Sequence, residues 1–342
     1  MVSGCVLRKV KCMISEPASA IAVSGLAKHF GEVTAVESVT FDVHEGELFG
    51  FLGPNGAGKT TTINMLTGLA RPDAGTICIA GINCSRNPKA AQHLMGVVPD
   101  ESNLYLELTG YDNLCFCGAL YGMPRRERET RARELLESFG LEPAAGRKFG
   151  GYSKGMKRKL TIAAGIIHKP SILFLDEPTT GIDVASARQI RKLIANLNSG
   201  GTTILLTTHY IEEAERLCGR IAFIVQGRIV RIDSVVDLMR ETQGRYVVEF
   251  GVSNGAESLC TAICEVFPAL ECWNVSPEAL RVESTEPVRI GPLVRLIEDH
   301  GEEVSESRKI RPSLEDVFVH VTGIEAKIMK QEREKTGKGS GA

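Results

Sequence analysis

The segment 53–61 has the residue types of a phosphate-binding loop. Its sequence, GPNGAGKTT, follows a stretch that is typical of a strand and precedes a helical pattern. Glycines let backbone N–H groups curl around a polyphosphate, and the start of the helix adds partial positive charge. Lys59 can reach the β- and γ-phosphates, and the Thr60 hydroxyl can ligate Mg²⁺. The predicted nucleotide site consists of Gly53, Pro54, Asn55, Gly56, Ala57, Gly58, Lys59, Thr60 and Thr61.

Two acidic residues end the apolar stretch SILFLDEP, residues 171–178. Asp176, at the end of the strand that this stretch predicts, is placed to hold Mg²⁺ through water. Glu177, beside it, is the candidate general base for an attacking water molecule. Asp176 lies 117 residues after Lys59, and no guanine-reading NKxD motif occurs, so a small GTPase is disfavoured.

The elements that position these residues alternate along the chain. Strand patterns fill much of residues 20–50, a helix follows the phosphate loop, and residues 101–170 are mostly helical. A buried strand, a helix, another strand and a short helix follow. This alternation predicts an α/β fold with a mostly parallel sheet and a helical insertion. We expect four regions: a loose N-terminal extension (1–19), a nucleotide-binding domain (20–238, with the insertion at about 101–170), a small α+β domain (239–323, in which Ser313 and Asp316 predict a helix cap) and a charged, Gly/Ser-rich tail (324–342).

Composition limits the class of protein. The chain has 342 residues, 43% hydrophobic and 24% charged, which is typical of globular domains. A net charge of −2 argues against a surface that wraps nucleic acid, so we expect no nucleic-acid partner. No apolar run approaches the roughly 20 residues that a spanning helix needs, and the first residues do not have the pattern of a signal peptide. A membrane role would therefore need another chain.

The ten cysteines are scattered, with no CxxC pair and no His at zinc-finger spacing. We expect reduced thiols that serve as small core residues. A metal site at Cys260, Cys264 and Cys272 is the alternative.

Five motifs occur in one order: GPNGAGKTT, YSKGM, ILFLDEP, GID and TTHY. In this order and spacing the chain resembles the ATP-binding subunits of ABC transporters. Within that family it is similar to the single-domain ATPases of ABC-2-type exporters. The resemblance covers residues 20 to about 235 densely, and PSLEDVF (312–318) resembles the C-terminal ending common in that subgroup. It implies a P-loop NTPase core of the ABC ATPase type.

The resemblance also implies roles for single residues. Ser153 and Gly155, in YSKGM, match the signature motif, which contacts ATP bound to a second protomer. Asp183, in GID, falls on the aspartate that contacts the other protomer. His209, in TTHY, falls on the switch histidine, which would bind the γ-phosphate and orient Glu177.

Other positions match the family only in part. Phe30 sits where the family places an aromatic ring against adenine. Asp100 stands where a glutamine is usual, and we expect it to keep a catalytic, metal-sensing role as a Mg²⁺ ligand with altered water positioning. Lys154 replaces a glycine beside the phosphate and is expected to attract ATP. The next cations, Lys157, Arg158 and Lys159, are expected to be solvated or interfacial.

The function that the resemblance implies is ATP hydrolysis coupled to transport. Two copies would sandwich two ATP molecules with Mg²⁺ in a head-to-tail homodimer, at the inner face of the cell membrane, on the cytoplasmic side. A separate integral membrane permease would receive the motion, with residues 103–114 as the coupling surface. One alternative is a non-transport ABC ATPase that acts on nucleic acid or the ribosome. Another is a regulatory module that binds ATP without hydrolysing it.

Overall fold

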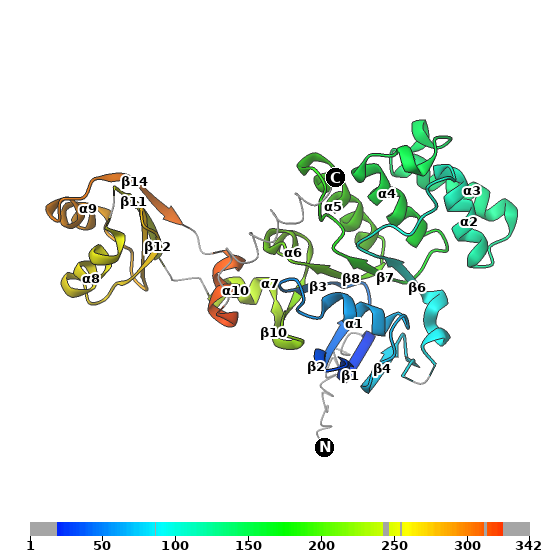
Figure 1. Cartoon of the computed structure of the whole chain (residues 1–342), viewed down its shortest axis with the longest axis horizontal. Coiled ribbons are helices and arrows are strands. Elements are labelled where there is room, and N and C mark those ends of the chain that lie inside the picture. Colours follow the sequence, from blue (N-terminus) through cyan, green and yellow to red (C-terminus); the bar gives the residue numbers. More distant parts are fainter. Residues whose placement is uncertain (1–18, 86, 242–245, 254, 311–312, 324–342) are drawn as a thin grey trace, which may run out of the picture.

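A computed structural model describes residues 19–85, 87–241, 246–253, 255–310 and 313–323. Three sheets organise the chain, two of them in one large domain and the third in a separate small domain (Figure 1). The expected N-terminal extension lies, except for Ser19, outside the described residues, as does the C-terminal tail.

The central sheet has six strands in the order β10-β9-β3-β8-β7-β6. Strands β9, β3, β8, β7 and β6 are parallel, and β10 runs antiparallel to β9 at the edge. Their bounds are β3 (Leu48–Leu52), β6 (Met95–Val98), β7 (Ile172–Asp176), β8 (Thr203–Thr208), β9 (Arg220–Val225) and β10 (Arg228–Ser234).

An antiparallel sheet in the order β2-β1-β4-β5 packs beside the central sheet. Its bounds are β1 (Ser19–Phe30), β2 (Val33–His44), β4 (Ala74–Ile79) and β5 (Ile82–Asn83). The helices of the large domain are α1 (Lys59–Leu66), α2 (Gly110–Leu120), α3 (Arg125–Ser138), α4 (Lys154–Gly165), α5 (Val184–Ser199), α6 (Ile211–Leu217) and α7 (Val235–Glu241). Short 3₁₀ helices are η1 (Pro88–Leu94), η2 (Glu142–Ala144) and η3 (Phe149–Gly151).

The central sheet is buried on both faces, which explains its continuous apolar strands. In β7, Ile172 and Phe174 pack with the antiparallel sheet and α1, whereas Leu173 and Leu175 pack with the helices of the other face. The same alternation holds in β3 and β8. Helices α4, α5 and α6 therefore lie across the sheet from α1. The predicted α/β fold with a helical insertion is confirmed.

The small domain spans residues 246–310 and has the order β-α-β-β-α-β. Its sheet order, β12-β13-β11-β14, is entirely antiparallel and matches a split βαβ or ferredoxin-like arrangement. Val248, Phe250, Leu280 and Val282 point from the sheet into a core beneath the two helices. The bounds are β11 (Tyr246–Val252), α8 (Ala256–Val266), β12 (Glu271–Ser276), β13 (Ala279–Ser284), α9 (Ile290–Asp299) and β14 (Val304–Ile310).

The last described helix, α10 (Leu314–Thr322), returns to the large domain. The capping box predicted from Ser313 and Asp316 is present at its start. Phe318 is fully buried against Phe223 of β9, with ring centroids 5.4 Å apart. The expected unit of 239–323 therefore differs from the structure at its C-terminal end, because α10 packs into the core of the nucleotide-binding domain. The small domain is inserted between α7 and α10 (Figure 1).

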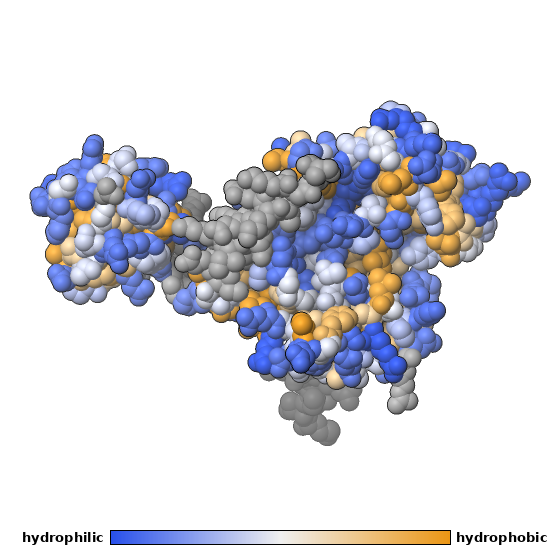
Figure 2. All heavy atoms as spheres, viewed as in Figure 1, coloured by the Kyte–Doolittle hydropathy of each residue, from blue (hydrophilic) through white to orange (hydrophobic). Residues whose placement is uncertain are grey.

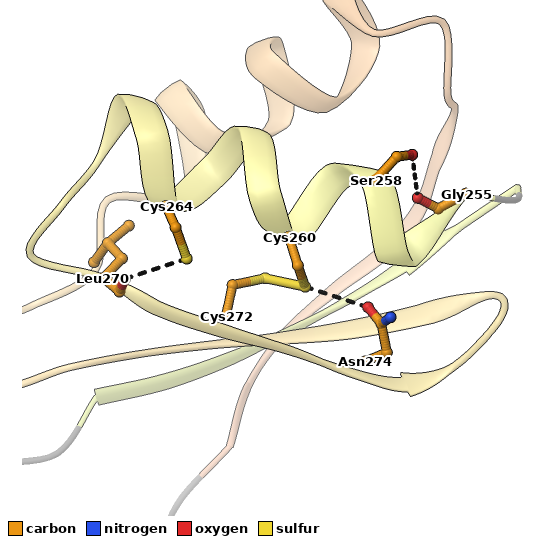
Figure 3. The surroundings of a disulfide bond; sticks show 7 residues. All are labelled: Gly255, Ser258, Cys260, Cys264, Leu270, Cys272 and Asn274. Atoms are coloured by element: carbon orange, nitrogen blue, oxygen red, sulfur yellow. Dashed lines mark hydrogen bonds between the residues drawn. A yellow bond between two sulfur atoms is a disulfide. The ribbon is translucent and has the colours of Figure 1, made fainter.

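Cys260 of α8 and Cys272 of β12 form a disulfide (Figure 3). Their Cα atoms lie 5.1 Å apart, within the range that a disulfide requires, because α8 packs directly on β12. The prediction of reduced thiols is therefore wrong for this pair, and a metal site that uses both sulfurs is excluded. Cys264, one turn along α8, keeps a thiol that donates to the carbonyl of Leu270. The expected thiols Cys5 and Cys12 lie outside the described residues.

None of the helices in the described ranges combines the length and the apolar character that crossing a bilayer requires.

Candidate nucleotide site

The phosphate loop leaves the carboxyl end of β3, the strand between β8 and β9, and leads into α1. Two of its glycines are required by close backbone contacts. A Cβ atom on Gly53 would lie 2.1 Å from the carbonyl oxygen of Ile224. At Gly58 the backbone is left-handed, with φ of 100°, and a Cβ atom would lie 2.5 Å from the carbonyl oxygen of Ala35. The loop can keep this shape only with glycine at both positions.

Lys59, Glu177 and His209 form a buried chain of contacts at the edge of the central sheet. The Lys59 ammonium group lies 3.1 Å from Oε1 of Glu177, and Nδ1 of His209 lies 2.7 Å from Oε2. Lys59 also donates to the carbonyls of Gly53 and Pro54. The three residues come from α1, the end of β7 and the end of β8. Because the carboxyl ends of parallel strands share one edge, residues far apart in sequence meet there.

The protonation of Glu177 follows from these contacts. Burial alone raises the pKa of a carboxyl group, but the hydrogen bond with His209 and the charge of Lys59 outweigh it and lower the pKa of Glu177 to about 2. Its backbone has φ of 47°, the left-handed region that is unfavourable for a residue with a side chain. Glu177 is thus an ionised carboxylate held in a constrained turn.

Asp176 is the predicted water-mediated Mg²⁺ ligand, and its surroundings fit a hard cation. Its side chain is 3% exposed, and the hydroxyl of Thr207 on β8 donates to its Oδ1. Thr60 lies in the first turn of α1 and is exposed. Oxygen donors of this kind are those that Mg²⁺ prefers. Thr207 was not predicted, although the register pairs it directly with Asp176.

Asp100 has a partner that the sequence did not indicate. Arg158 of α4 lies with Nη2 3.3 Å from Oδ1 of Asp100, and its guanidinium also donates to the carbonyls of Pro99, Asp100 and Glu177. Arg158 is 8% exposed, so the prediction of a solvated or interfacial side chain is wrong for it. Its four contacts explain why the cation faces inward. A Mg²⁺ ion at Asp100 would share the carboxylate with this guanidinium.

The groups around Asp100 shift the pKa of its carboxyl group in opposite directions. Partial burial raises the pKa of the Asp100 carboxyl, Arg158 lowers it, and Glu177 and Asp176 raise it again. The net direction is upward. The group therefore carries its negative charge less readily than an isolated aspartate, which moderates the cost of placing it beside the two other acids.

The signature turn and the GID aspartate form a second group, at the N-termini of α4 and α5. Ser153 caps α4 by accepting from the backbone N–H of Met156 at 3.3 Å, and Asp183 caps α5 by accepting from that of Ser186 at 2.9 Å. A Cβ atom on Gly155 would lie 2.5 Å from the Ser186 hydroxyl, so the two helix starts touch. Lys154 is exposed beside them.

Phe30 ends β1, and its side chain is 55% exposed. The Lys28 ammonium lies 5.3 Å from its ring centroid and pairs with Asp73 at 2.9 Å. The ring is thus presented to solvent on a hairpin that a salt bridge braces. Such a ring can stack on a flat base.

Known proteins are similar to this chain in sequence and structure, over different shares of its length. A sequence model of the family described as ABC transporter matches residues 36–180. The daunorubicin resistance ATP-binding protein DrrA2 of Streptomyces coeruleorubidus is 38% identical over 311 residues, which cover 89% of this chain and 95% of that protein. The Nod factor export ATP-binding protein I of Rhizobium sp. (strain N33) is also 38% identical, over 90% of this chain and 98% of that protein.

A solved structure of a dimeric ATP-binding cassette, in a post-hydrolysis state with bound ADP and Pi, matches with a TM-score of 0.59. It is 27% identical and covers 63% of this chain and 98% of that chain. The two relatives thus extend over nearly the whole chain, whereas the cassette matches a share no larger than the nucleotide-binding domain.

Proposed function

The chain belongs to the ABC transporter family of ATP-binding proteins, and we propose that it is the ATPase of an exporter whose membrane-spanning part is a separate chain. The observation that carries this proposal is the buried contact of Lys59, Glu177 and His209 beside a phosphate loop. The relatives named for drug resistance and Nod factor export support the direction of transport. The transported molecule would be selected by the membrane chain.

In the proposed reaction, a water molecule attacks the γ-phosphorus atom of ATP, and the bond to the β–γ bridging oxygen breaks to give ADP and phosphate. Glu177 accepts the proton of the water, and His209 holds Glu177 and contacts the γ-phosphate. Phe30 would stack on adenine. With a pKa of about 2, Glu177 is a weak base while Lys59 lies against it. When Lys59 turns to the phosphates, Glu177 loses one of its charge partners and becomes a stronger base, so ATP itself would prepare the base.

Mg²⁺, when bound, neutralises part of the phosphate charge. Thr60 and Asp176 would hold it, and Asp100 would join them to the extent that Arg158 releases its carboxylate.

The signature turn supports a head-to-tail homodimer. Its helix, α4, packs on the face of the central sheet opposite to α1, whose start holds the phosphate loop. Ser153 and the first N–H groups of α4 would then meet a γ-phosphate bound by a second copy, with Asp183 at the contact between copies. In the solved dimeric cassette, two domains of this kind form a pair. ATP would close the dimer because it contacts both copies only in the closed state.

The permease would dock on the helical insertion, at the inner face of the membrane. Five large apolar side chains are exposed there, and Figure 2 shows apolar surface over α2. Tyr105 and Phe116 contact each other edge to face, with ring centroids 5.2 Å apart. Exposed apolar clusters of this kind mark protein contacts. The five residues are Tyr105, Leu106, Phe116, Leu120 and Tyr121.

The test compares wild type with Glu177→Gln for ATPase activity and for copurification with the membrane chain. We expect turnover to fall about 100-fold or more, with ATP binding and copurification retained. Equal turnover of the two proteins would contradict the role of Glu177. Copurification with ribosomes or nucleic acid in place of a membrane protein would contradict the exporter.

A further inference from the structure

We propose that Glu213 is a positioning residue that joins the turn after Glu177 to the helix after His209 and so keeps these two groups in contact. Nothing in the five motifs marks Glu213, which lies four residues after His209. The inference deepens the proposed function because it concerns the same base and histidine.

Glu213 bridges the two segments through one side chain. It lies in α6, which begins two residues after His209. Its Oε1 accepts a hydrogen bond from the hydroxyl of Thr179 at 2.8 Å, and Thr179 lies two residues after Glu177. Helix α6 thereby holds the turn that contains the base.

The same turn is held at its other side by Glu177 itself. Thr180 donates from its hydroxyl to Oε2 of Glu177 at 3.0 Å, the oxygen that lies 2.7 Å from His209. The left-handed backbone of Glu177 needs such support, because an unfavourable φ persists only where its surroundings fix it. Without the contact from Glu213, the turn has one restraint fewer next to the reacting group.

Glu213 is buried more deeply than is usual for a residue with a carboxyl group. Its side chain is 2% exposed, and Oε2 is buried together with Oε1. Burial raises the pKa of Glu213, opposed by the hydroxyls of Thr208 and Thr179 and by the charge of Arg191, and reinforced by Glu177. The nearby Cys218 thiol is buried, and this burial, reinforced by the charge of Glu213, raises its pKa. These surroundings make the charged form of the carboxyl group less favourable than it is in an exposed glutamate.

Glutamine is the matched substitute for Glu213, because it has the same shape and its amide oxygen can accept from Thr179. The role therefore needs the hydrogen bond and the shape, and it does not need the charge. This separates it from the role of Glu177, for which the charge is required.

The experiment measures kcat, the KM for ATP and ATP binding in the full chain for Glu213→Gln, Glu213→Ala and Thr179→Val. We expect Glu213→Gln to stay within about twofold of wild type in kcat. We expect Glu213→Ala and Thr179→Val each to lower kcat about tenfold, with KM changed less than about twofold, because the phosphate loop is untouched. The double variant Glu213→Ala/Thr179→Val should lose little more kcat than either single variant, since each substitution removes the same hydrogen bond.

The matched control is Glu212→Gln, on the same helix with a side chain 85% exposed, and its kcat should equal that of wild type. A loss of kcat in Glu213→Gln as large as in Glu213→Ala would overturn the proposal, and so would a wild-type kcat in Thr179→Val. Thr179→Val is nearly isosteric, so it keeps the test informative where Glu213→Ala fails to fold. Wild-type ATPase activity that Glu177→Gln abolishes shows separately that the proposed reaction takes place.

Discussion

The ionised form of Glu177 is stabilised by the same contacts that make it a weak base. Its carboxylate is buried, yet its pKa is lowered to about 2 because His209 and Lys59 both lie against it. A carboxyl group with a lowered pKa in the folded state stabilises the fold while it is ionised. That contribution is present above the ordinary pKa of 4.5 and is lost as the pH falls toward 2.

The nucleotide-free protein should therefore show a pH-dependent difference from Glu177→Gln. At neutral pH we expect wild type to be more stable to denaturant, by an amount on the order of 3 kcal/mol, because a shift of one pKa unit is about 1.36 kcal/mol. The difference should shrink as the pH falls from about 5 to about 3. Glu212→Gln, an exposed neighbour, should show no such trend. A gap that is constant over this range would mean that ionisation of Glu177 does not stabilise the fold.

The contacts of Asp100 allow a test of whether its carboxylate ligates Mg²⁺. If its carboxylate reaches Mg²⁺, Asp100→Ala should raise the Mg²⁺ concentration for half-maximal ATPase activity about tenfold. Glu101→Ala, at the next, exposed residue, should leave it unchanged. An unchanged Mg²⁺ dependence in Asp100→Ala would leave Asp100 with the ion pair to Arg158 as its role.

At the scale of elements, α2 combines a buried side with an exposed apolar side. Leu114 packs in the core, whereas Leu120 is 71% exposed and Phe116 is 38% exposed. A contiguous exposed apolar side of this kind is typical of a surface that binds another protein, because apolar area in contact with water is unfavourable. The exposed side continues onto Tyr105 and Leu106 of the preceding loop.

Leu120→Glu should weaken copurification with the membrane chain and lower transport about tenfold or more, because a charge would enter an apolar contact. The basal ATPase activity of the isolated chain should stay within about twofold. Leu69→Glu is the matched control, since Leu69 is 72% exposed and lies after α1. Equal transport by Leu120→Glu and wild type would remove α2 from the docking surface.

The sequence predicted those elements whose patterns are local. The strand before the phosphate loop, the apolar strand that ends in Asp176 and the capping box at Ser313 are all present. It did not predict contacts that depend on register or on long-range packing. Thr207 faces Asp176 because β7 and β8 pair in one register, and Arg158 turns inward because the loop at Pro99 offers carbonyl groups to it. The disulfide likewise depends on how α8 lies on β12.

At the scale of the whole molecule, the small domain is joined to the rest through two helices that are neighbours. Helices α7 and α10 contact each other, and α10 also contacts α6, β9 and β10. An ion pair between Arg281 of β13 and Asp316 of α10, 3.3 Å, connects the small domain to this support. Arg281 also pairs with Glu249 on the same face of the sheet, at 2.8 Å.

Replacing residues 246–310 by a short Gly/Ser linker should leave a nucleotide-binding domain that folds and hydrolyses ATP, because α10 can still bury Phe318 against Phe223. Ending the chain after residue 241 removes the same small domain together with α10. That shorter protein should be less stable by about 3 kcal/mol or more, the cost typical of losing a large buried aromatic side chain. Thermal unfolding of both proteins is the measurement. Equal stability would show that α10 contributes nothing to the core.

The insertion of the small domain also sets an order of events during synthesis. Phe223 is translated almost 100 residues before Phe318, the α10 residue that packs against it in the folded protein. While the small domain emerges from the ribosome, the face around β9 and α6 is left without α10 and exposes apolar surface to solvent. The small domain has its own core and can form during this interval. We therefore expect the nascent chain to pass through a stage with exposed apolar surface, which ends when α10 is synthesised and packs on β9.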